Sequence, residues 1–358
     1  MFLTILIVII SLVLLLTIHE FGHFILAKKF GVEVEEFGIG YPPRLFGKKI
    51  GETFYSLNLL PFGAFVKIKG EEGQIEDSRS FPEKPIWQRA LIVLGGVVSF
   101  WIVAFIIFSL ISGVWGLPTA VSDDFPGESN VQIVGVSKDS PALKADLKMG
   151  DIIRELKIEN EKLGISKIKE IQEFSETHKG EEIVLTIQRG GEISEVSLIP
   201  RVSSPEDEGA IGVALVRVSK VKYSWSKSLY IGAVVTYQKT IQIPIVLGGV
   251  FRNFLKGEKT EGVELMGPIG VVDVMGQALN TGVDSFLILV AMIAVWLALF
   301  NILPIPALDG GKLLFLIIEG IRKKPISQKI EQGITIFCFV CLLVLMFVVT
   351  IKDVLNLL

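Results

Sequence analysis

The chain contains few of the residues that usually build disulfide frameworks and metal sites. Its 358 residues include two cysteines and three histidines. Cys338 and Cys341 lie in one apolar run near the C-terminus, which excludes a disulfide framework and indicates small packing residues on a helix. Charged residues make up 20% of the chain and the net charge is −3, so composition gives no reason to expect a nucleic-acid partner.

Apolar sequence, in contrast, is abundant. Hydrophobic residues account for 50% of the chain and mean hydropathy is +0.57, which is unusual for a soluble enzyme. Because the first apolar run lacks a basic flank and a small-residue cleavage site, we do not expect a removable signal peptide. The sequence predicts a multi-pass α-helical membrane protein whose four transmembrane helices lie in the runs Phe2–Ala27, Leu91–Val114, Phe286–Leu303 and Ile334–Ile351.

Basic residues are distributed unevenly between these runs. Lysine and arginine gather in the short segments after the first and third runs. The positive-inside rule therefore places both segments in the cytoplasm. The long segment between the second and third runs, and both chain ends, are then expected on the outer side of a bacterial cytoplasmic membrane.

The first run contains the motif His19-Glu20-Phe21-Gly22-His23. Helical spacing brings the two imidazoles to the same face, where they can bind one metal ion, and Glu20 lies beside them to accept a proton from water activated by that metal. Ionisable residues inside a membrane helix are costly and usually functional. The alternative is that the polar side chains bond to a neighbouring helix.

A catalytic zinc ion usually takes three protein ligands, so a third must come from elsewhere in the chain. The remaining histidine, His178, lies in polar sequence on the opposite side of the membrane, and the two cysteines are placed nearer the outer end of the fourth run. Asp309 follows the third run, after two prolines that break the helix at membrane depth. We predict one Zn²⁺ per chain, held by His19, His23 and Asp309; an ordinary turn aspartate is the alternative.

Residues 30–89 are predicted to form strands and turns on the cytoplasmic side. Glycine and proline mark turns at 38–43, and residues 54–60 and 63–69 are rich in strand-forming residues. These short apolar strands suit a membrane-associated β-region beside the metal, whose edge could pair with an extended substrate. A plain cytoplasmic hairpin is the alternative.

Residues 116–216 have ordinary polarity and are predicted to form a separate α+β domain. Strands are expected at 131–136 and 183–187, and between them Ser140 should cap a helix that begins at Pro141 and is closed by Gly150. The stretch 140–153 resembles the permuted PDZ domains of bacterial envelope proteases, although Asp146 replaces a glycine of that pattern. The resemblance implies an inserted extracytoplasmic PDZ domain that binds peptides.

Residues 223–255 are apolar but interrupted by lysines, a glutamine and Pro244. This pattern predicts an amphipathic segment lying on the outer membrane surface. A fifth transmembrane helix is the competing interpretation, and it would reverse the predicted orientation of everything that follows.

Together the His-Glu-x-x-His motif, the PDZ-like stretch and the sequence 301–311 (NILPIPALDGG) resemble the site-2 protease family of intramembrane zinc metalloproteases, especially its bacterial regulator-of-sigma-E members. The resemblance implies zinc on His19, His23 and Asp309 and Glu20 as the catalytic glutamate. It also implies that Asn301 helps to hold substrate. The residues of the β-region that would contact substrate as a strand are Gly63, Ala64, Phe65 and Val66.

We therefore expect an intramembrane zinc endopeptidase that cuts single-span membrane proteins, such as anti-sigma factors or remnant signal peptides. The alternatives are a non-catalytic membrane adaptor that uses a PDZ domain, and a zinc protease that cuts membrane proteins at cytoplasmic loops. The expected boundaries are 1–29 (first helix), 30–89 (β-region), 90–115 (second helix), 116–216 (PDZ domain), 217–285 (amphipathic region), 286–333 (third helix and Asp309 motif) and 334–358 (fourth helix).

Overall fold

The computed structural model describes residues 2–71, 73, 77–159, 161–205, 208–257 and 266–357. The chain divides into two compact units. We call the first the helical unit (Met1–Ser109, Leu229–Leu279 and Phe286–Leu358) and the second the inserted unit (Leu110–Ser228 with Asn280–Ser285).

Four long apolar helices dominate the helical unit: α1 (Phe2–Lys29), α2 (Ile86–Val114), α7 (Val283–Asn301) and α9 (Gln328–Leu357). Three of them contain a predicted run in full, and α7 ends at Asn301, two residues before the end of the predicted run Phe286–Leu303. All four are long and apolar enough to cross a membrane. On α9 the large apolar side chains are exposed, as at Phe337, Phe347 and Val348. An apolar surface of this kind suits a lipid environment, because water would disfavour it.

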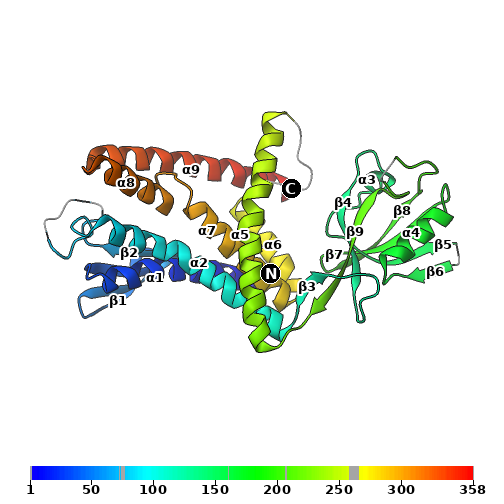
Figure 1. Cartoon of the computed structure of the whole chain (residues 1–358), viewed down its shortest axis with the longest axis horizontal. Helices are drawn as coiled ribbons and strands as arrows, with labels where there is room; N and C mark the ends of the chain where they lie inside the picture. Colours follow the sequence, from blue (N-terminus) through cyan, green and yellow to red (C-terminus); the bar gives the residue numbers. More distant parts are fainter. Residues whose placement is uncertain are drawn as a thin grey trace. The chain divides into compact units, whose positions relative to one another are not determined.

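Glycines bring α1 and α2 into close contact. A β-carbon built on Gly22 would lie 2.2 Å from the carbonyl oxygen of Gly95, so any larger residue would push the two backbones apart. Small residues commonly allow such close helix packing within membranes. The two helices run side by side in Figure 1. Their contact at Gly22 lies within the motif of α1.

The predicted β-region is a curled sheet of two long strands, β1 (Val34–Ile50) and β2 (Thr53–Ile68). Residues 36–39 of β1 pair on one side with residues 54–57 and on the other with residues 64–67 of β2. Residues 38–43 lie within β1, but the chain reverses direction there, as predicted: residues 36–39 and residues 44–49 pair with the same stretch of β2 in opposite order. The prolines are accommodated where the pairing register shifts, between Tyr41 and Arg44.

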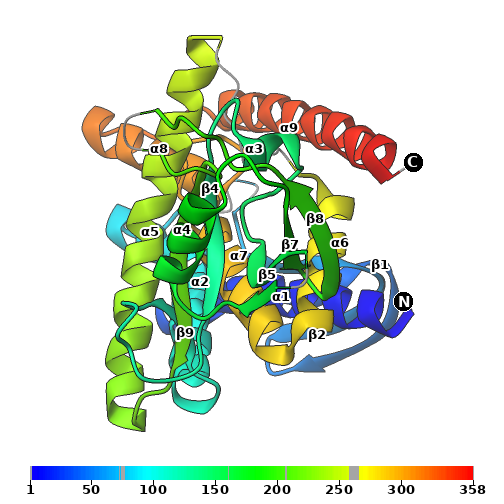
Figure 2. The ribbon, with the colours of Figure 1, turned by 90° about the vertical axis from the view of Figure 1, so that its right-hand side faces the viewer.

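The predicted amphipathic segment forms one helix, α5 (Trp225–Leu255), which contains Pro244. The axis of α5 runs across the axis of α1 in both views (Figures 1 and 2). A β-carbon on Gly232 would lie 2.0 Å from Ser109 Oγ, so α5 packs closely against the end of α2. Part of the predicted amphipathic region, residues 258–265, lies outside the described residues.

Two shorter helices complete the helical unit: α6 (Pro268–Thr281) and α8 (Asp309–Arg322). The carboxylate of Asp353, near the end of α9, accepts hydrogen bonds from the amides of Gly267 at 3.0 Å and Gly270 at 2.9 Å. It therefore caps the N-terminus of α6 from a distant part of the chain, which explains the short Gly-Pro-Ile-Gly sequence there.

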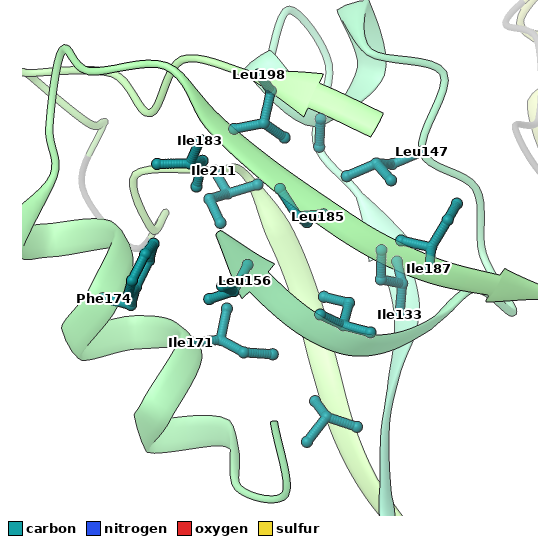
Figure 3. Packing of buried hydrophobic residues seen from close by; sticks show 13 residues of the cluster. Ile133, Leu147, Leu156, Ile171, Phe174, Ile183, Leu185, Ile187, Leu198 and Ile211 are labelled. Carbon is teal, nitrogen blue, oxygen red and sulfur yellow. The ribbon is translucent and has the colours of Figure 1, made fainter. Parts of the chain in front are cut away.

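The inserted unit is built on a seven-stranded sheet with strand order β3-β9-β4-β5-β7-β8, and β6 pairs with β5. Alternate side chains of β5 and β7, including Leu156, Leu185 and Ile187, form the buried core together with Ile171 and Phe174 of a helix (Figure 3). The elements are β3 (Leu117–Ala120), β4 (Asn130–Val136), α3 (Pro141–Lys144), β5 (Ile152–Ile158), β6 (Glu161–Gly164), α4 (Ile168–Thr177), β7 (Ile183–Arg189), β8 (Glu192–Leu198) and β9 (Val213–Val221).

Helix α3 begins as expected but ends earlier. The Ser140 hydroxyl accepts a hydrogen bond from the Leu143 amide at 3.1 Å, and Pro141 occupies the first helical position. The helix ends before Asp146, whose φ of 58° lies in the left-handed region that stops a helix. The prediction that Gly150 closes the helix was therefore wrong, because Asp146 already supplies the left-handed turn.

Candidate metal centre

Three side chains from two helices meet in the helical unit. His19 and His23 project from one face of α1, and Asp309 is the first residue of α8. The Nε2 atoms of the two histidines are 3.4 Å apart, and each lies 3.4 Å from Asp309 Oδ2. Among the described residues they are the one group of three or more potential histidine, cysteine or carboxylate ligands close enough to share a metal ion.

The spacing of these atoms fits a tetrahedral zinc site. Zinc bonds of about 2.0–2.1 Å with tetrahedral angles place neighbouring ligand atoms about 3.3 Å apart. Asp309 Oδ2 is buried without a hydrogen-bond partner among the described residues, although it lies next to both imidazoles. A buried carboxylate oxygen is costly unless something satisfies it, and a bound cation would do so.

The orientation of each imidazole is also fixed by α2. His23 Nδ1 lies 2.9 Å from the carbonyl oxygen of Ile92, so Nδ1 carries the proton and Nε2 is left as a lone-pair donor. The His19 ring stacks on Phe100, with ring centroids 4.7 Å apart. Both contacts hold the rings with Nε2 directed at the shared site.

Gly96 of α2 provides the space for this arrangement. A β-carbon there would lie 2.2 Å from His23 Nε2 and 2.6 Å from a carbon of the His19 ring. Any side chain would therefore displace the imidazoles. The sequence reasoning did not identify Gly96, Ile92 or Phe100, because nothing in the local pattern shows which part of α2 faces the motif.

The turn before Asp309 is held by close backbone packing. Helix α7 ends at Asn301, and Pro304 and Pro306 lie in the turn that follows. β-Carbons on Gly310 and Gly311 would lie 2.1 Å and 2.4 Å from carbonyl oxygens of this turn, so both positions require glycine. The turn thereby folds back onto the first residues of α8 and delivers the Asp309 carboxylate to the histidines.

Lys312 lies one turn after Asp309 and is surrounded by negative charge. It forms an ion pair with Glu71. Although desolvation opposes the effect, the charges of Glu71, Asp309 and Glu20 raise the pKa of Lys312.

A second ion pair holds α8 in place. Arg89 of α2 donates to both carboxylate oxygens of Glu319, at 3.1 Å and 2.6 Å. Paired hydrogen bonds of this geometry fix orientation as well as distance. Because Glu319 and Asp309 share α8, the pair ties the helix that carries Asp309 to the helix that packs against His19 and His23.

Glu20 is half-buried on the same helix as the histidines and contacts the β-region. Its Oε2 atom accepts a hydrogen bond from the Val66 amide at 3.1 Å. The predicted substrate-binding residues Gly63, Ala64, Phe65 and Val66 all belong to β2, so the structure brings that stretch next to the motif.

The other predicted site residue, Asn301, is the last residue of α7. Its side-chain amide donates to the Leu297 carbonyl at 2.9 Å, within its own helix. His178 belongs to the inserted unit, where it lies 2.7 Å from a carboxylate oxygen of Glu181 at the end of α4.

Comparison with known proteins identifies the family. The sequence profile of peptidase family M50 matches residues 7–345. A zinc metalloprotease by name from Clostridium perfringens is 33% identical over 340 residues, which cover 95% of this chain and 95% of that protein. The regulator of sigma-W protease RasP of Bacillus subtilis is 27% identical over 418 residues, covering 94% of both chains.

A further relative, from Clostridium acetobutylicum and also bearing a zinc metalloprotease name, is 33% identical over 359 residues, covering 99% of this chain and 98% of that protein. These relatives and the four apolar helices indicate an integral membrane protein with zinc as its cofactor. The chain belongs to peptidase family M50 and is a zinc metalloendopeptidase of the site-2 type.

Proposed function

We propose that this chain hydrolyses peptide bonds within or near the transmembrane segments of single-span membrane proteins. The observation that carries the proposal is the 3.4 Å triangle of His19, His23 and Asp309 atoms, in which both histidines lie on an apolar helix long enough to span a bilayer. In this proposal the two histidines and Asp309 hold zinc, and Glu20 is the catalytic base.

Zinc bound at these three residues would supply Lewis-acid chemistry, polarising the scissile carbonyl and making water more acidic. The protein's own residues supply the rest. Glu20 accepts the proton from the attacking water and returns it to the leaving amine. Ile92 and Phe100 keep the imidazoles oriented, and Lys312 balances the negative charge beside the site.

A substrate helix must unwind before it is cut, because its carbonyl groups are otherwise engaged in hydrogen bonds. Unpaired backbone groups are costly in lipid. Residues 63–66 of β2 lie beside Glu20 and can pair with the unwound segment as an added strand. Asn301, at the end of α7, would hold a further part of the substrate chain.

We assign the inserted unit to the PDZ class, outside the bacterial cytoplasmic membrane, and the metal centre to the cytoplasmic side. The sequence 140–153 and the basic residues after α1 and α8 support this arrangement. Its strands and helices, with a buried core, form a module able to screen substrates by size. It would exclude proteins whose outer part has not been shortened by a first cut.

The substrate class we propose is membrane-anchored regulators such as anti-sigma factors, and remnant signal peptides. The Bacillus subtilis relative is named as a regulator of sigma-W, which supports the first of these. Both kinds of protein present one apolar helix and little structure outside the membrane once trimmed.

The test is cleavage of a tagged single-span protein in detergent by wild type and Glu20→Gln, with zinc measured in both. We expect the variant to keep its zinc and to lose activity by about 10²–10⁴-fold, the usual contribution of a general base. Glu176→Gln, an exposed change in the inserted unit, is the matched control.

The cut position separates the proposal from its alternatives. A cut within the apolar segment supports it, whereas cuts confined to cytoplasmic loops would indicate a protease that does not act inside the membrane. Zinc binding without cleavage of any trimmed substrate would instead favour an adaptor that only binds partners.

A further inference from the structure

The hydrogen bond between Glu20 and Val66 lies on the outer edge of the β-region. Residues 64–67 of β2 pair with residues 36–39 of β1, and no further strand pairs on the other side of them among the described residues. In an antiparallel strand, alternate residues direct both backbone groups to the same side. The Val66 amide is directed to Glu20, away from β1, whereas the Lys69 amide is directed to Glu33. By this alternation the backbone N–H and C=O groups of Ala64, Val66 and Ile68 are directed away from β1.

Glu20 occupies the place of a partner strand at this edge. Its carboxylate oxygen lies 3.1 Å from the Val66 nitrogen. A carbonyl oxygen of a paired strand would lie about 2.9 Å from the same nitrogen. The two oxygens cannot share that position, so a strand that pairs across Val66 must displace the carboxylate.

Space for such a strand is present along the same edge. A cavity of about 480 Å³ is lined by Tyr41, residues 65–68 and Glu71, and its volume is that of an ordinary ligand site. Val66 lines this cavity and its amide donates to Glu20, so the cavity reaches the neighbourhood of Glu20.

We propose that the Val66 amide holds Glu20 away from its catalytic position, and that a substrate strand frees Glu20 by taking over this hydrogen bond. The proposal rests on the function proposed above and adds a regulatory step to it. Val66 acts here as a positioning residue through its backbone, not through its side chain. Glu20 becomes available as a base only when a chain long enough to pair with the edge is in place.

Competition between Glu20 and a substrate strand for the Val66 amide can be measured from the affinity for a peptide, without any cleavage. Neither Glu20→Ala nor Glu20→Gln has the catalytic carboxylate, so each can be loaded with a synthetic single-span peptide. Glutamine keeps an oxygen that can accept from Val66, whereas alanine does not. We therefore expect Glu20→Ala to bind the peptide about fivefold more tightly than Glu20→Gln, the effect of one ordinary hydrogen bond.

Removing the amide should abolish this difference. Val66→Pro lacks the N–H, and proline is tolerated where an edge residue directs its N–H outward. We expect both Glu20 variants to bind equally in the Val66→Pro background, and to differ about fivefold in a Val66→Ala background, which keeps the amide. Equal binding with Val66 intact, or a difference that survives in Val66→Pro, would overturn the proposal.

Hydrogen exchange at residues 64–68 of the full-length protein tests the contact itself. The Val66 amide should exchange faster in Glu20→Ala than in wild type and become protected again when the peptide binds. Unchanged exchange in Glu20→Ala, or no protection by bound peptide, would overturn the proposal. If wild type cuts the peptide but these results fail, only this inference falls; if wild type binds zinc and cuts no trimmed substrate, the proposed function falls.

Discussion

Gly96 lies so close to His23 that no residue larger than glycine fits at this position. A β-carbon at this position would lie 2.2 Å from His23 Nε2, the atom that lies 3.4 Å from Asp309 Oδ2. Since α1 and α2 are already in backbone contact at Gly22 and Gly95, neither helix can move aside without separating the pair.

We therefore predict that Gly96→Ala loses zinc and proteolytic activity. The added methyl group must displace the imidazole that α2 holds at Ile92. The matched control is Gly333→Ala in α9, where a β-carbon meets nothing within 4 Å. That control should keep zinc and activity and gain up to about 1 kcal/mol of stability, because alanine favours helix more than glycine. Full zinc in purified Gly96→Ala would contradict the prediction.

Asp309→Asn is expected to lower the affinity for zinc by about 100-fold or more. Changes to residues behind the ligands already cost 10–100-fold in other sites, and this change removes a charged ligand. The measurement is competition with a graded chelator, followed by metal analysis. Asp273→Asn, at an exposed carboxylate on α6 bonded to Gln277, is the control and should keep wild-type affinity. Equal affinities would remove Asp309 from the ligand set.

Asp353→Ala should destabilise the protein without affecting zinc. The carboxylate caps α6 through the amides of Gly267 and Gly270, at 3.0 Å and 2.9 Å. Loss of a capping side chain usually costs about 0.5–2 kcal/mol. Thermal unfolding in detergent should show a lower midpoint for Asp353→Ala than for Asp273→Ala, with zinc content unchanged in both. A midpoint equal to wild type would mean that water replaces the cap at no cost.

The Arg89–Glu319 pair should couple α2 and α8 strongly. Both side chains are mostly buried, and Arg89→Met would leave Glu319 without a partner, at a cost of about 3–5 kcal/mol. Adding Glu319→Gln removes that unpaired charge, so we expect the double variant to be more stable than Arg89→Met alone. Unfolding free energies of wild type, both single variants and the double variant measure the coupling. Additive effects would show that the pair does not contribute through contact.

Much of the helical architecture could be predicted because membrane helices depend on the sequence of their own segment. The four apolar runs correspond to four long helices, and the motif spacing places His19 and His23 on one face. Asp309 could be predicted to join them, since two prolines end the helix before it and few other ligands exist.

The contacts around the site could not be predicted, since they depend on how distant segments pack. Nothing near Gly96 distinguishes it from Gly113 on the same helix, yet only Gly96 faces the imidazoles. Residues 38–43 have the composition of a turn and the chain reverses there, but strand pairing continues on both sides of the reversal, which turn composition does not specify. The Val66–Glu20 hydrogen bond likewise depends on the curl of the sheet, which strand propensity does not specify.

The two ends of the segment Leu110–Ser228, which makes up most of the inserted unit, lie next to each other. The Tyr223 amide donates to the Ser112 carbonyl at 3.0 Å, and Gly113 packs against Trp225. Because the two ends of this segment are in contact, its length does not change the distance between the residues that flank it. If the inserted unit screens substrates as proposed, this segment could be cut out and its ends rejoined by a few residues, or exchanged for another module, to change substrate selection without changing the metal centre.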